Sequence, residues 1–326
     1  MEQDVKIMPQ SKQNKVSIVV PCYNEEQVLP AMYQRLKALM DAHTEYQWEV
    51  IFIDDGSQDA TIEHIKRFHQ DDPRICFIAL SRNFGKENAM LAGFDHATGD
   101  CIAIIDADLQ DPPEMIIEML GYWHEGYEDV YARRATRGKE PWLRKKFSLM
   151  YYSLLQRTTQ VDVLPNVGDF RLLDRKCINA LRQLRENERY TKGMFCWIGF
   201  KKKEVLMNRD DRASGKSSFN FFKLFNLAIE GITSYTTFPL RIVTLLGLLS
   251  SAIAILLTAV YFTKALLFGD PVQGFPTLIV AILLIGGVQL LGMGIMGEYI
   301  SRIFIETKRR PVYLISEKGG LEDDKD

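Results

Sequence analysis

Two long uncharged segments in the last third of this 326-residue chain constrain its fold more than any other feature. The first runs from Ile242 to Thr263 and the second from Pro271 to Gly297. About 20 apolar residues in a helix are enough to cross the ~30 Å hydrocarbon layer of a bilayer. The sequence therefore predicts transmembrane helices over residues 242–268 and 274–298. Two buried helices of a soluble protein are the alternative.

The short link between these segments, "FGDPVQG", predicts a helical hairpin with both flanks on one side of the membrane. Arg241 precedes the first segment, and basic residues such as Lys308 follow the second. Because cytoplasmic flanks are enriched in Lys and Arg, we expect a multi-pass protein of the inner (plasma) membrane with both termini in the cytoplasm. The polar N-terminus shows no signal peptide, so residues 1–15 are predicted to be a flexible tail and 299–326 a cytoplasmic C-terminal tail.

Composition excludes some classes of partner and site. The net charge of −2 gives no reason to expect binding to nucleic acid. The five cysteines lack the spacing of a metal site, so we expect reduced cytosolic thiols with structural roles.

The part of the chain before the membrane segments alternates β-rich runs with amphipathic stretches. The β-rich runs are "VSIVV" (16–20), "WEVIFI" (48–53), "ICFIAL" (75–80), "CIAII" (101–105) and "DVYAR" (129–133). This alternation predicts right-handed βαβ units and an α/β domain with a mostly parallel sheet over residues 16–218. Residues 219–241 space their apolar side chains at helical intervals, which predicts an interfacial amphipathic segment or, alternatively, a helix packed on the soluble domain.

Polar motifs follow four of the predicted strands: "PCYNEE", "DDGSQDAT", "SRNFGKENA" and "DADLQD". Ligands of open α/β sheets bind beyond the carboxyl ends of the strands, so these motifs are predicted to form the active site. An Asp-x-Asp pair suits Mg²⁺ or Mn²⁺, which prefer oxygen ligands. If the chain stayed extended there, Asp106, Asp108 and Gln110 would lie on one side of it.

Several of these motifs resemble a known family. "VVPCYNEE", "IDDGSQDAT" and "DADLQDPPE" are similar in order and spacing to family-2 glycosyltransferases, which have the Rossmann-like GT-A fold. "NVGDFRLLDRK", "FNLAIEGITSYTTFPLRI" and "GEYISRIFIETKRRPVYLI" extend the resemblance, from residue 16 to about 315, to polyprenyl-phosphate glycosyltransferases. Within that group the chain looks most like bacterial bactoprenol glucosyltransferases and is similar to dolichyl-phosphate mannose synthases.

The resemblance implies roles for residues that bind the donor, a UDP-sugar. Those implied to bind the nucleotide sugar are Pro21, Tyr23, Glu25, Asp54 or Asp55, Lys86, Asp106, Arg212 and Lys216. Asp108 and Gln110 are implied to hold Mg²⁺ or Mn²⁺ on the diphosphate. Lys216 lies two places earlier than the corresponding lysine of the family, so it either contacts the phosphate from another angle or leaves that contact missing.

The resemblance also implies the residues that act on the acceptor, undecaprenyl phosphate. Asp169 occupies the place of the family's catalytic carboxylate, facing the anomeric carbon, and the second implied catalytic residue, Asp106, would lie by the ribose and the donor sugar. Because a lipid phosphate is already largely dianionic at pH 7, we expect Asp169 to orient the acceptor or stabilise the oxocarbenium-like centre more than to abstract a proton. A helix-capping role for Asp169 is the alternative. The implied phosphate-binding residues are Arg134, Arg137 and Arg144, although a basic patch facing anionic lipid would have a similar sequence.

The function favoured by these patterns is inverting transfer of one sugar, with glucose favoured, to give a lipid-linked sugar for cell-surface glycans such as O-antigen or teichoic acid. UDP-N-acetylglucosamine or another donor remains open. A processive polysaccharide synthase is disfavoured because the chain lacks a Gln-x-x-Arg-Trp motif, and a non-catalytic lipid-sugar transporter because the three carboxylates at 106, 108 and 169 are present. "GMGIMG" (292–297) predicts close helix packing and, with it, a homo-oligomer.

Overall fold

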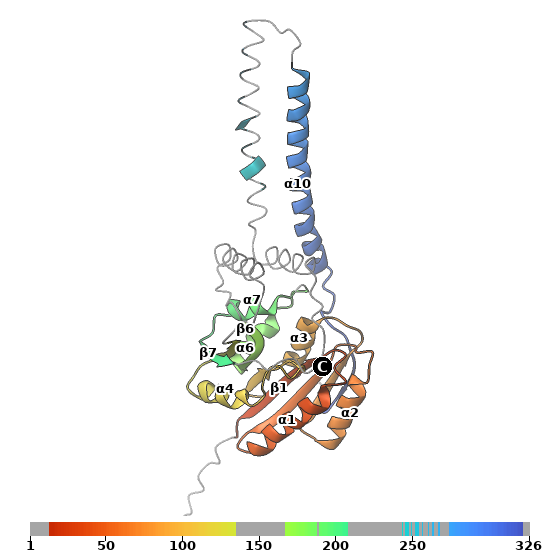
Figure 1. Cartoon of the computed structure of the whole chain (residues 1–326), viewed down its shortest axis with the longest axis vertical. Helices are drawn as coiled ribbons and strands as arrows, with labels where there is room; N and C mark the ends of the chain where they lie inside the picture. The colour runs from red at the N-terminus through yellow and green to blue at the C-terminus, as the bar shows by residue number, and fades with distance from the viewer. Residues whose placement is uncertain are drawn as a thin grey trace, which may run out of the picture. The chain divides into compact units, whose positions relative to one another are not determined.

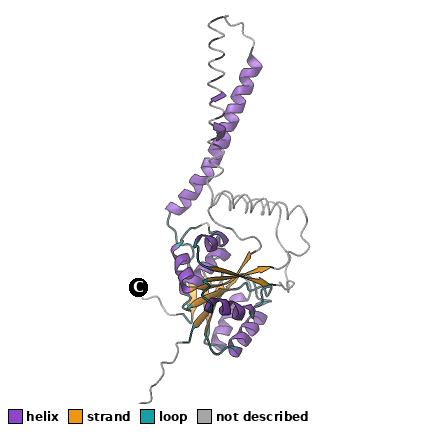
Figure 2. Cartoon of the chain, turned by 90° about the vertical axis from the view of Figure 1, so that its left-hand side faces the viewer, coloured by secondary structure: helices purple, strands orange, loops and turns teal. Residues whose placement is uncertain are grey.

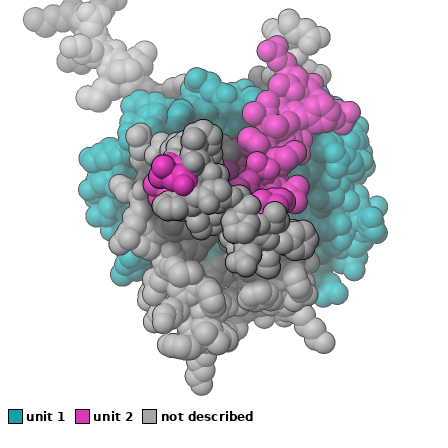
Figure 3. Space-filling view, turned by 90° about the horizontal axis from the view of Figure 1, so that it is seen from above, with its two compact units in different colours: residues 1–148, 161–218, 311–326 teal, residues 149–160, 219–310 magenta. Residues whose placement is uncertain are grey.

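The computed structural model describes residues 13–134, 167–187, 189–207 and 274–321, together with scattered positions between 243 and 267. The chain divides into two compact units, which Figure 3 colours separately. The first comprises residues 1–148, 161–218 and 311–326, and the second comprises 149–160 and 219–310. Each unit is described by itself below.

The first unit is built on an eight-stranded sheet with the order β7-β5-β6-β4-β1-β2-β3-β8. Four strands at its centre are parallel: β1 (Lys15–Cys22), β2 (Gln47–Asp54), β3 (Ile75–Leu80) and β4 (Cys101–Ile104). β5 (Asp129–Arg134) and β7 (Lys202–Met207) are parallel to each other, whereas β6 (Val167–Asp174) runs antiparallel to both β4 and β5. The predicted α/β domain with a mostly parallel sheet is confirmed.

Helices cover both faces of this sheet (Figure 2). One face carries α1 (Leu29–Ala42), α2 (Thr61–Asp71) and α4 (Met115–His124), and the other carries α3 (Lys86–His96), α6 (Arg175–Gln183) and α7 (Thr191–Trp197). Successive residues of a strand point to opposite faces, so Ile18 packs in the first layer and Val19 in the second. Because both faces are buried, the strands appear in the sequence as continuous apolar runs.

The second unit contains the helix α10 (Phe275–Thr307), which Figure 1 labels. Its stretch Ile285–Thr307 is, among the described residues, the one helical stretch long and apolar enough to cross a membrane. It overlaps the second predicted transmembrane helix. Most of the first one, 242–268, and all of the amphipathic segment 219–241 lie outside the described residues, so the hairpin remains a prediction.

A glycine on α10 marks a close helix contact inside the second unit. A Cβ atom added at Gly292 would lie 3.0 Å from Cγ1 of Val243, tighter than most van der Waals contacts. Gly292 is buried, and it begins the "GMGIMG" sequence. This contact agrees with the predicted close packing for Gly292, whereas a Cβ atom at Gly294 or Gly297 would meet nothing within 4 Å in the described structure.

The segment 299–326, expected to be a C-terminal tail, is more ordered than that description implies. Helix α10 continues to Thr307, and residues Ile315–Gly319 form strand β8, antiparallel to β3 at the edge of the sheet. The pairing depends on the exposed edge of β3, which supplies backbone hydrogen-bonding groups to any neighbouring segment. At the other end, β1 already begins at Lys15, and residues 1–12 lie outside the described part of the chain.

Candidate functional site

The loops that follow β1 and β2 are joined by hydrogen bonds between residues of the polar motifs. The backbone N–H of Asn24 donates to Oγ of Ser57 over 2.9 Å, and the N–H of Gln58 donates to Oδ1 of Asn24 over 2.9 Å. The N–H of Glu25 donates to Oγ1 of Thr61 over 2.9 Å. Several polar side chains of these two motifs therefore hold the two loops together at the carboxyl ends of β1 and β2.

Asp55 ties the β2 loop to the loop that precedes α3. Its two carboxylate oxygens accept the backbone N–H groups of Phe84, at 2.7 Å, and Gly85, at 2.9 Å. The side chain is buried, and this burial raises its pKa although the two hydrogen bonds oppose the rise. Gly56 brings the loops together, because a Cβ there would lie 2.4 Å from the carbonyl carbon of Arg82. Asp55 thus joins the two loops, and its assignment to the nucleotide stays a prediction.

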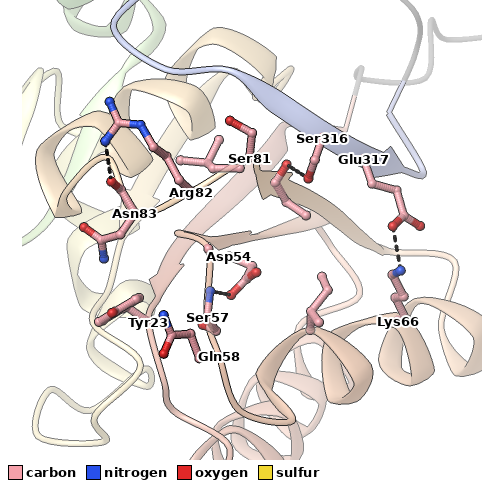
Figure 4. Close-up of a pocket in the computed structure, with 14 residues that line it drawn as sticks. Tyr23, Asp54, Ser57, Gln58, Lys66, Ser81, Arg82, Asn83, Ser316 and Glu317 are labelled. Atoms are coloured by element: carbon pink, nitrogen blue, oxygen red, sulfur yellow. Dashed lines mark hydrogen bonds and ion pairs between the residues drawn. The ribbon is translucent and has the colours of Figure 1, made fainter.

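Asp54, by contrast, lines a cavity of about 490 Å³ at the carboxyl ends of β1, β2 and β3 (Figure 4). It is 4% exposed, accepts the N–H of Ser57 over 3.2 Å, and has a pKa raised by burial. Tyr23, which is 44% exposed, lines the same cavity. Pro21 and Glu25 belong to the same strand and loop but do not line it. Of the residues predicted for the nucleotide, this cavity brings together Tyr23 and Asp54.

The lining residues that were not assigned to the site from the sequence include Lys66, Arg82, Ser316 and Glu317. Arg82 lies in the "SRNFGKENA" motif, which did indicate a functional loop, and its guanidinium carbon is 4.1 Å from the centre of the Phe84 ring. Lys66, on α2, carries no motif. Ser316 and Glu317 come from the segment that was expected to be a tail, and nothing in their sequence indicated a strand.

A second group of side chains lies at the ends of β4 and β6 and at the start of α3. Nζ of Lys86 is 2.6 Å from Oδ1 of Asp106 and 2.6 Å from Oδ2 of Asp169. The antiparallel register pairs Ile104 of β4 with Arg171 of β6. Continued by two residues, that register sets Asp106 opposite Asp169. The two predicted catalytic residues therefore come together because of strand pairing, and α3 places Lys86 between them.

Lys86 compensates the repulsion between these carboxylates. The Asp169 side chain is only 11% exposed, against 25% for Asp106 and 41% for Lys86. Burial alone would raise the pKa of Asp169, but the charge and hydrogen bond of Lys86, together with the charges of Lys192 and Arg171, outweigh it and hold that pKa below the usual range. Burial would likewise lower the pKa of Lys86, yet the two carboxylates raise it. At neutral pH Asp169 is therefore an ionised, weakly basic carboxylate.

The next residue of α3, Glu87, is a carboxyl group of the opposite character. Its pKa rises from an ordinary value of 4.5 to about 7, first because it is buried and second because Asp169 is negatively charged. Its Oε2 atom accepts the backbone N–H of Thr191, on α7, over 3.1 Å. Glu87 thus titrates near neutral pH beside a carboxylate that does not.

The chain after Asp106 turns, so the extended segment that would place residues 106, 108 and 110 on one side is not formed. Leu109 has a φ of 60°, and Oδ1 of Asp108 accepts the backbone N–H of Gln110 over 3.1 Å. A side chain that bonds to the backbone two residues ahead stabilises a turn at the expense of extended structure. Gln110 is buried, with 7% of its surface exposed. The assignment of Asp108 and Gln110 to a metal remains a prediction.

The oxygen-rich character of this region fits a hard divalent cation such as Mg²⁺. Asp106 and Asp108 lie two residues apart, and Oδ1 of Asp169 is buried without a hydrogen-bond partner in the described structure. Within the described residues, no three His, Cys, Asp or Glu side chains are grouped closely enough to enclose a metal.

The remaining predicted residues concern the acceptor phosphate and the donor diphosphate. The backbone of Arg134 ends β5, on the far side of β6 from β4. Arg137, Arg144, Arg212 and Lys216 all lie outside the described residues, and their roles stay predictions.

The chain is similar in sequence to known glycosyltransferases. The sequence profile described as glycosyl transferase family 2 matches residues 17–182. The bactoprenol glucosyl transferase of Shigella phage SfV is 42% identical over 304 residues, which cover 93% of this chain and 99% of that protein. An uncharacterized glycosyltransferase of Synechocystis sp. is 42% identical over 308 residues, covering 94% of this chain and 96% of the relative. Among solved structures, glucosyl-3-phosphoglycerate synthase from Mycobacterium tuberculosis in complex with Mn²⁺, UDP-glucose and phosphoglyceric acid is 17% identical, covers 68% of this chain and 78% of that one, and superposes with a TM-score of 0.45.

Proposed function

Because the chain belongs to glycosyl transferase family 2, we propose that it transfers one glucose residue from UDP-glucose to a polyprenyl phosphate, with undecaprenyl phosphate as the acceptor. One observation carries the proposal. A nucleoside-sized cavity and the Lys86–Asp106–Asp169 group both lie at the end of the sheet where the parallel strands β1 to β4 finish. Similarity to a bactoprenol glucosyl transferase over 93% of the chain supports the choice of acceptor and sugar.

The cavity is suited to the uridine part of the donor. Its volume of about 490 Å³ lies within the usual range of small-molecule sites. Tyr23 offers an exposed aromatic ring on which a base can stack, and the buried Asp54 offers carboxylate oxygens that can accept hydrogen bonds from it. UDP-N-acetylglucosamine presents the same nucleoside, so it remains the alternative donor.

A divalent cation, Mg²⁺ or Mn²⁺, would be held by Asp108 and Gln110 next to the diphosphate. When bound, such an ion neutralises the charge that develops on the leaving nucleoside diphosphate. This proposal is supported by the concentration of oxygen donors after β4 and by the unpartnered Oδ1 atom of Asp169 nearby.

The carboxylates beside Lys86 have a different task. Lys86 bridges Asp106 and Asp169 and holds them fixed relative to each other. As the bond from the sugar to the diphosphate breaks, positive charge develops at the anomeric centre, and a pre-positioned carboxylate stabilises that charge. The acceptor phosphate attacks from the opposite side and inverts the configuration. Since this phosphate is largely dianionic at pH 7, Asp169 does not have to remove a proton from it.

Other parts of the chain would bind the acceptor lipid and the membrane. Arg134, Arg137 and Arg144 would bind the lipid phosphate, as arginine binds phosphate oxygens in pairs. Helix α10 would anchor the protein in the inner membrane, with the catalytic unit on the cytoplasmic side.

A panel of radiolabelled nucleotide sugars tests the donor. The purified full chain is incubated with undecaprenyl phosphate, Mg²⁺ and one of UDP-glucose, UDP-N-acetylglucosamine, UDP-galactose or GDP-mannose. We expect lipid-extractable label from UDP-glucose above all others. Preferential use of UDP-N-acetylglucosamine would replace glucose by the alternative sugar, and preferential use of GDP-mannose would contradict the uridine assignment.

A further inference from the structure

Strand β8 contains an irregularity directly at the cavity. The register with β3 pairs Ala79 with Glu317 but Leu80 with Ile315, so Ser316 is an extra residue on β8, a β-bulge. In a regular strand two consecutive side chains point to opposite faces. Here both Ser316 and Glu317 line the same cavity (Figure 4). Bulges are common next to active sites because they redirect side chains.

The bulge is held from both sides. Oγ of Ser316 donates to the carbonyl oxygen of Ala79 over 2.9 Å, and the N–H of Ser81 donates to the carbonyl oxygen of Leu314 over 2.9 Å. β8 is therefore locked to β3 on each side of the extra residue. These hydrogen bonds fix the position of the backbone from which the Glu317 side chain projects.

Glu317 in turn holds a lysine from a different element. Its Oε2 atom lies 2.6 Å from Nζ of Lys66, on α2, and both side chains line the cavity. The two side chains are 51% and 39% exposed. Ion pairs with that much exposure contribute little to the stability of a fold. The pair consequently has little value to the fold, whereas it places an ammonium group at the wall of a ligand cavity.

We propose that Lys66 binds the nucleoside part of the donor and that Glu317, aimed by the β8 bulge, is the positioning residue that holds Lys66 for this contact. The inference rests on the proposed function, because it deepens the assignment of this cavity to the donor. It adds a part of the chain that follows helix α10 to the donor site.

The order of strands explains why the contact is with the nucleoside and not with the phosphates. From β4, which carries Asp106, the sheet continues through β1 and β2 to β3 and then β8. At ~4.8 Å between neighbouring strands, β3 lies about 14 Å from β4. A nucleotide sugar can lie across the carboxyl ends of these strands with its sugar at Asp106 and Asp169. Its nucleoside then lies near β3, β8 and Lys66, and its diphosphate lies between the sugar and the nucleoside.

The chemistry of a pyrimidine nucleoside matches the groups at this end of the cavity. Uracil carries two carbonyl oxygens and ribose carries two free hydroxyls, all of which accept hydrogen bonds. The cavity already supplies acceptors in Asp54 and a stacking ring in Tyr23. Lys66 adds a second cationic donor beside Arg82, since an ammonium group has three N–H donors and no acceptor.

Binding of UMP and UDP to the purified full chain, measured by titration calorimetry, tests the proposal. Lys66→Met should weaken both nucleotides by the same factor, about tenfold, as expected for loss of a hydrogen bond from a charged donor. Arg67→Met is the matched control, because Arg67 is the next residue of α2 but does not line the cavity; it should leave binding unchanged. Thermal midpoints of all variants check that the fold is kept.

A double-mutant cycle separates positioning from a merely structural role of Glu317. Glu317→Gln should weaken UMP binding by a smaller factor in the wild type and have no further effect in the Lys66→Met background. Unchanged UMP affinity in Lys66→Met, a loss much greater for UDP than for UMP, or additive effects of the two substitutions would overturn the proposal. Failure of the proposed acceptor would look different, since wild-type protein would then still bind UMP but transfer no sugar to polyprenyl phosphate.

Discussion

Nζ of Lys86 lies 2.6 Å from Oδ2 of Asp169, and this ion pair joins the start of α3 to strand β6. The same atom lies 2.6 Å from Asp106, at the end of β4. One ammonium group therefore connects two carboxylates that strand pairing forces to face each other. The proposed chemistry depends on this arrangement, because it holds both carboxylates where the sugar is expected to lose its leaving group.

Replacing the ammonium group should impair catalysis strongly. In Lys86→Met, Asp106 and Asp169 face each other without compensation, so we expect kcat to fall by ~10²–10³, the range seen when a pre-positioned electrostatic group is removed. Steady-state kinetics of sugar transfer measure the effect. Lys176→Met is a suitable control, since Lys176 is a lysine of the same unit with 70% of its side chain exposed. Full activity of Lys86→Met would exclude the role given to Lys86.

Asp169→Asn distinguishes stabilisation of charge from removal of a proton. Lys86 holds the pKa of Asp169 below its usual range, so Asp169 stays ionised throughout the pH range of an assay. The acid limb of the rate profile should then reflect the acceptor phosphate, with a pKa near 6. We expect the variant to lower kcat by ~10²–10³ at every pH from about 6 to 9 without changing the shape of the profile. Loss of the acid limb in the variant would instead identify Asp169 as a base.

Glu87 should make stability depend on pH in a definite direction. Its pKa is about 7 in the folded chain against an ordinary value of 4.5. Below about pH 4.5 Glu87 is protonated in both states, and its contribution to the free energy of unfolding is fully present. Between about pH 4.5 and 7 this contribution is lost, because Glu87 ionises in the unfolded chain while it stays protonated in the folded chain. Glu87→Gln resembles the protonated form at every pH. The thermal midpoint of the variant should match wild type at pH 5 and exceed it at pH 8; an equal difference at both values would refute this account.

Asp108 tests the proposed metal site. Asp108→Ala should abolish metal-dependent turnover, because the diphosphate would lose the ion that stabilises it as a leaving group. Titration of Mg²⁺ and Mn²⁺ into the transfer assay, before and after treatment with EDTA, measures this dependence. Gln110→Ala, which removes a neutral ligand, should have a weaker effect than Asp108→Ala. Retention of full activity by Asp108→Ala would rule out the assignment.

The sheet could be predicted because its signals are local. Each of β1 to β5 is an apolar or β-rich run, and most of the intervening segments are helices, so the βαβ pattern is present in the sequence itself. Strand β8 could not be predicted in this way. Its five residues include two charges, and the strand exists because the edge of β3 is available to pair with it. Glu317 was missed together with this strand, whereas Lys66 was missed because its part of α2 carries no motif.

Within the site, residue types were predictable but their partners were not. Asp54 and Asp55 are adjacent and chemically identical. The structure distinguishes them because backbone N–H groups of the loop before α3 donate to the carboxylate of Asp55 and not to that of Asp54. The meeting of Asp106 with Asp169 depends on the antiparallel register of β6, which no local pattern encodes. The turn at Leu109 was missed because leucine rarely adopts a positive φ.

The measurement that tests the central claim most directly is identification of the lipid product made by the purified full chain. The protein is incubated with UDP-glucose, undecaprenyl phosphate and Mg²⁺, and the lipid fraction is separated by chromatography and analysed by mass spectrometry and by NMR of the anomeric proton. We predict one product, undecaprenyl phosphate bearing a single hexose with inverted configuration, and none from Asp108→Ala. A lipid carrying several sugars, retained configuration, or no lipid product from any UDP-sugar would contradict the account.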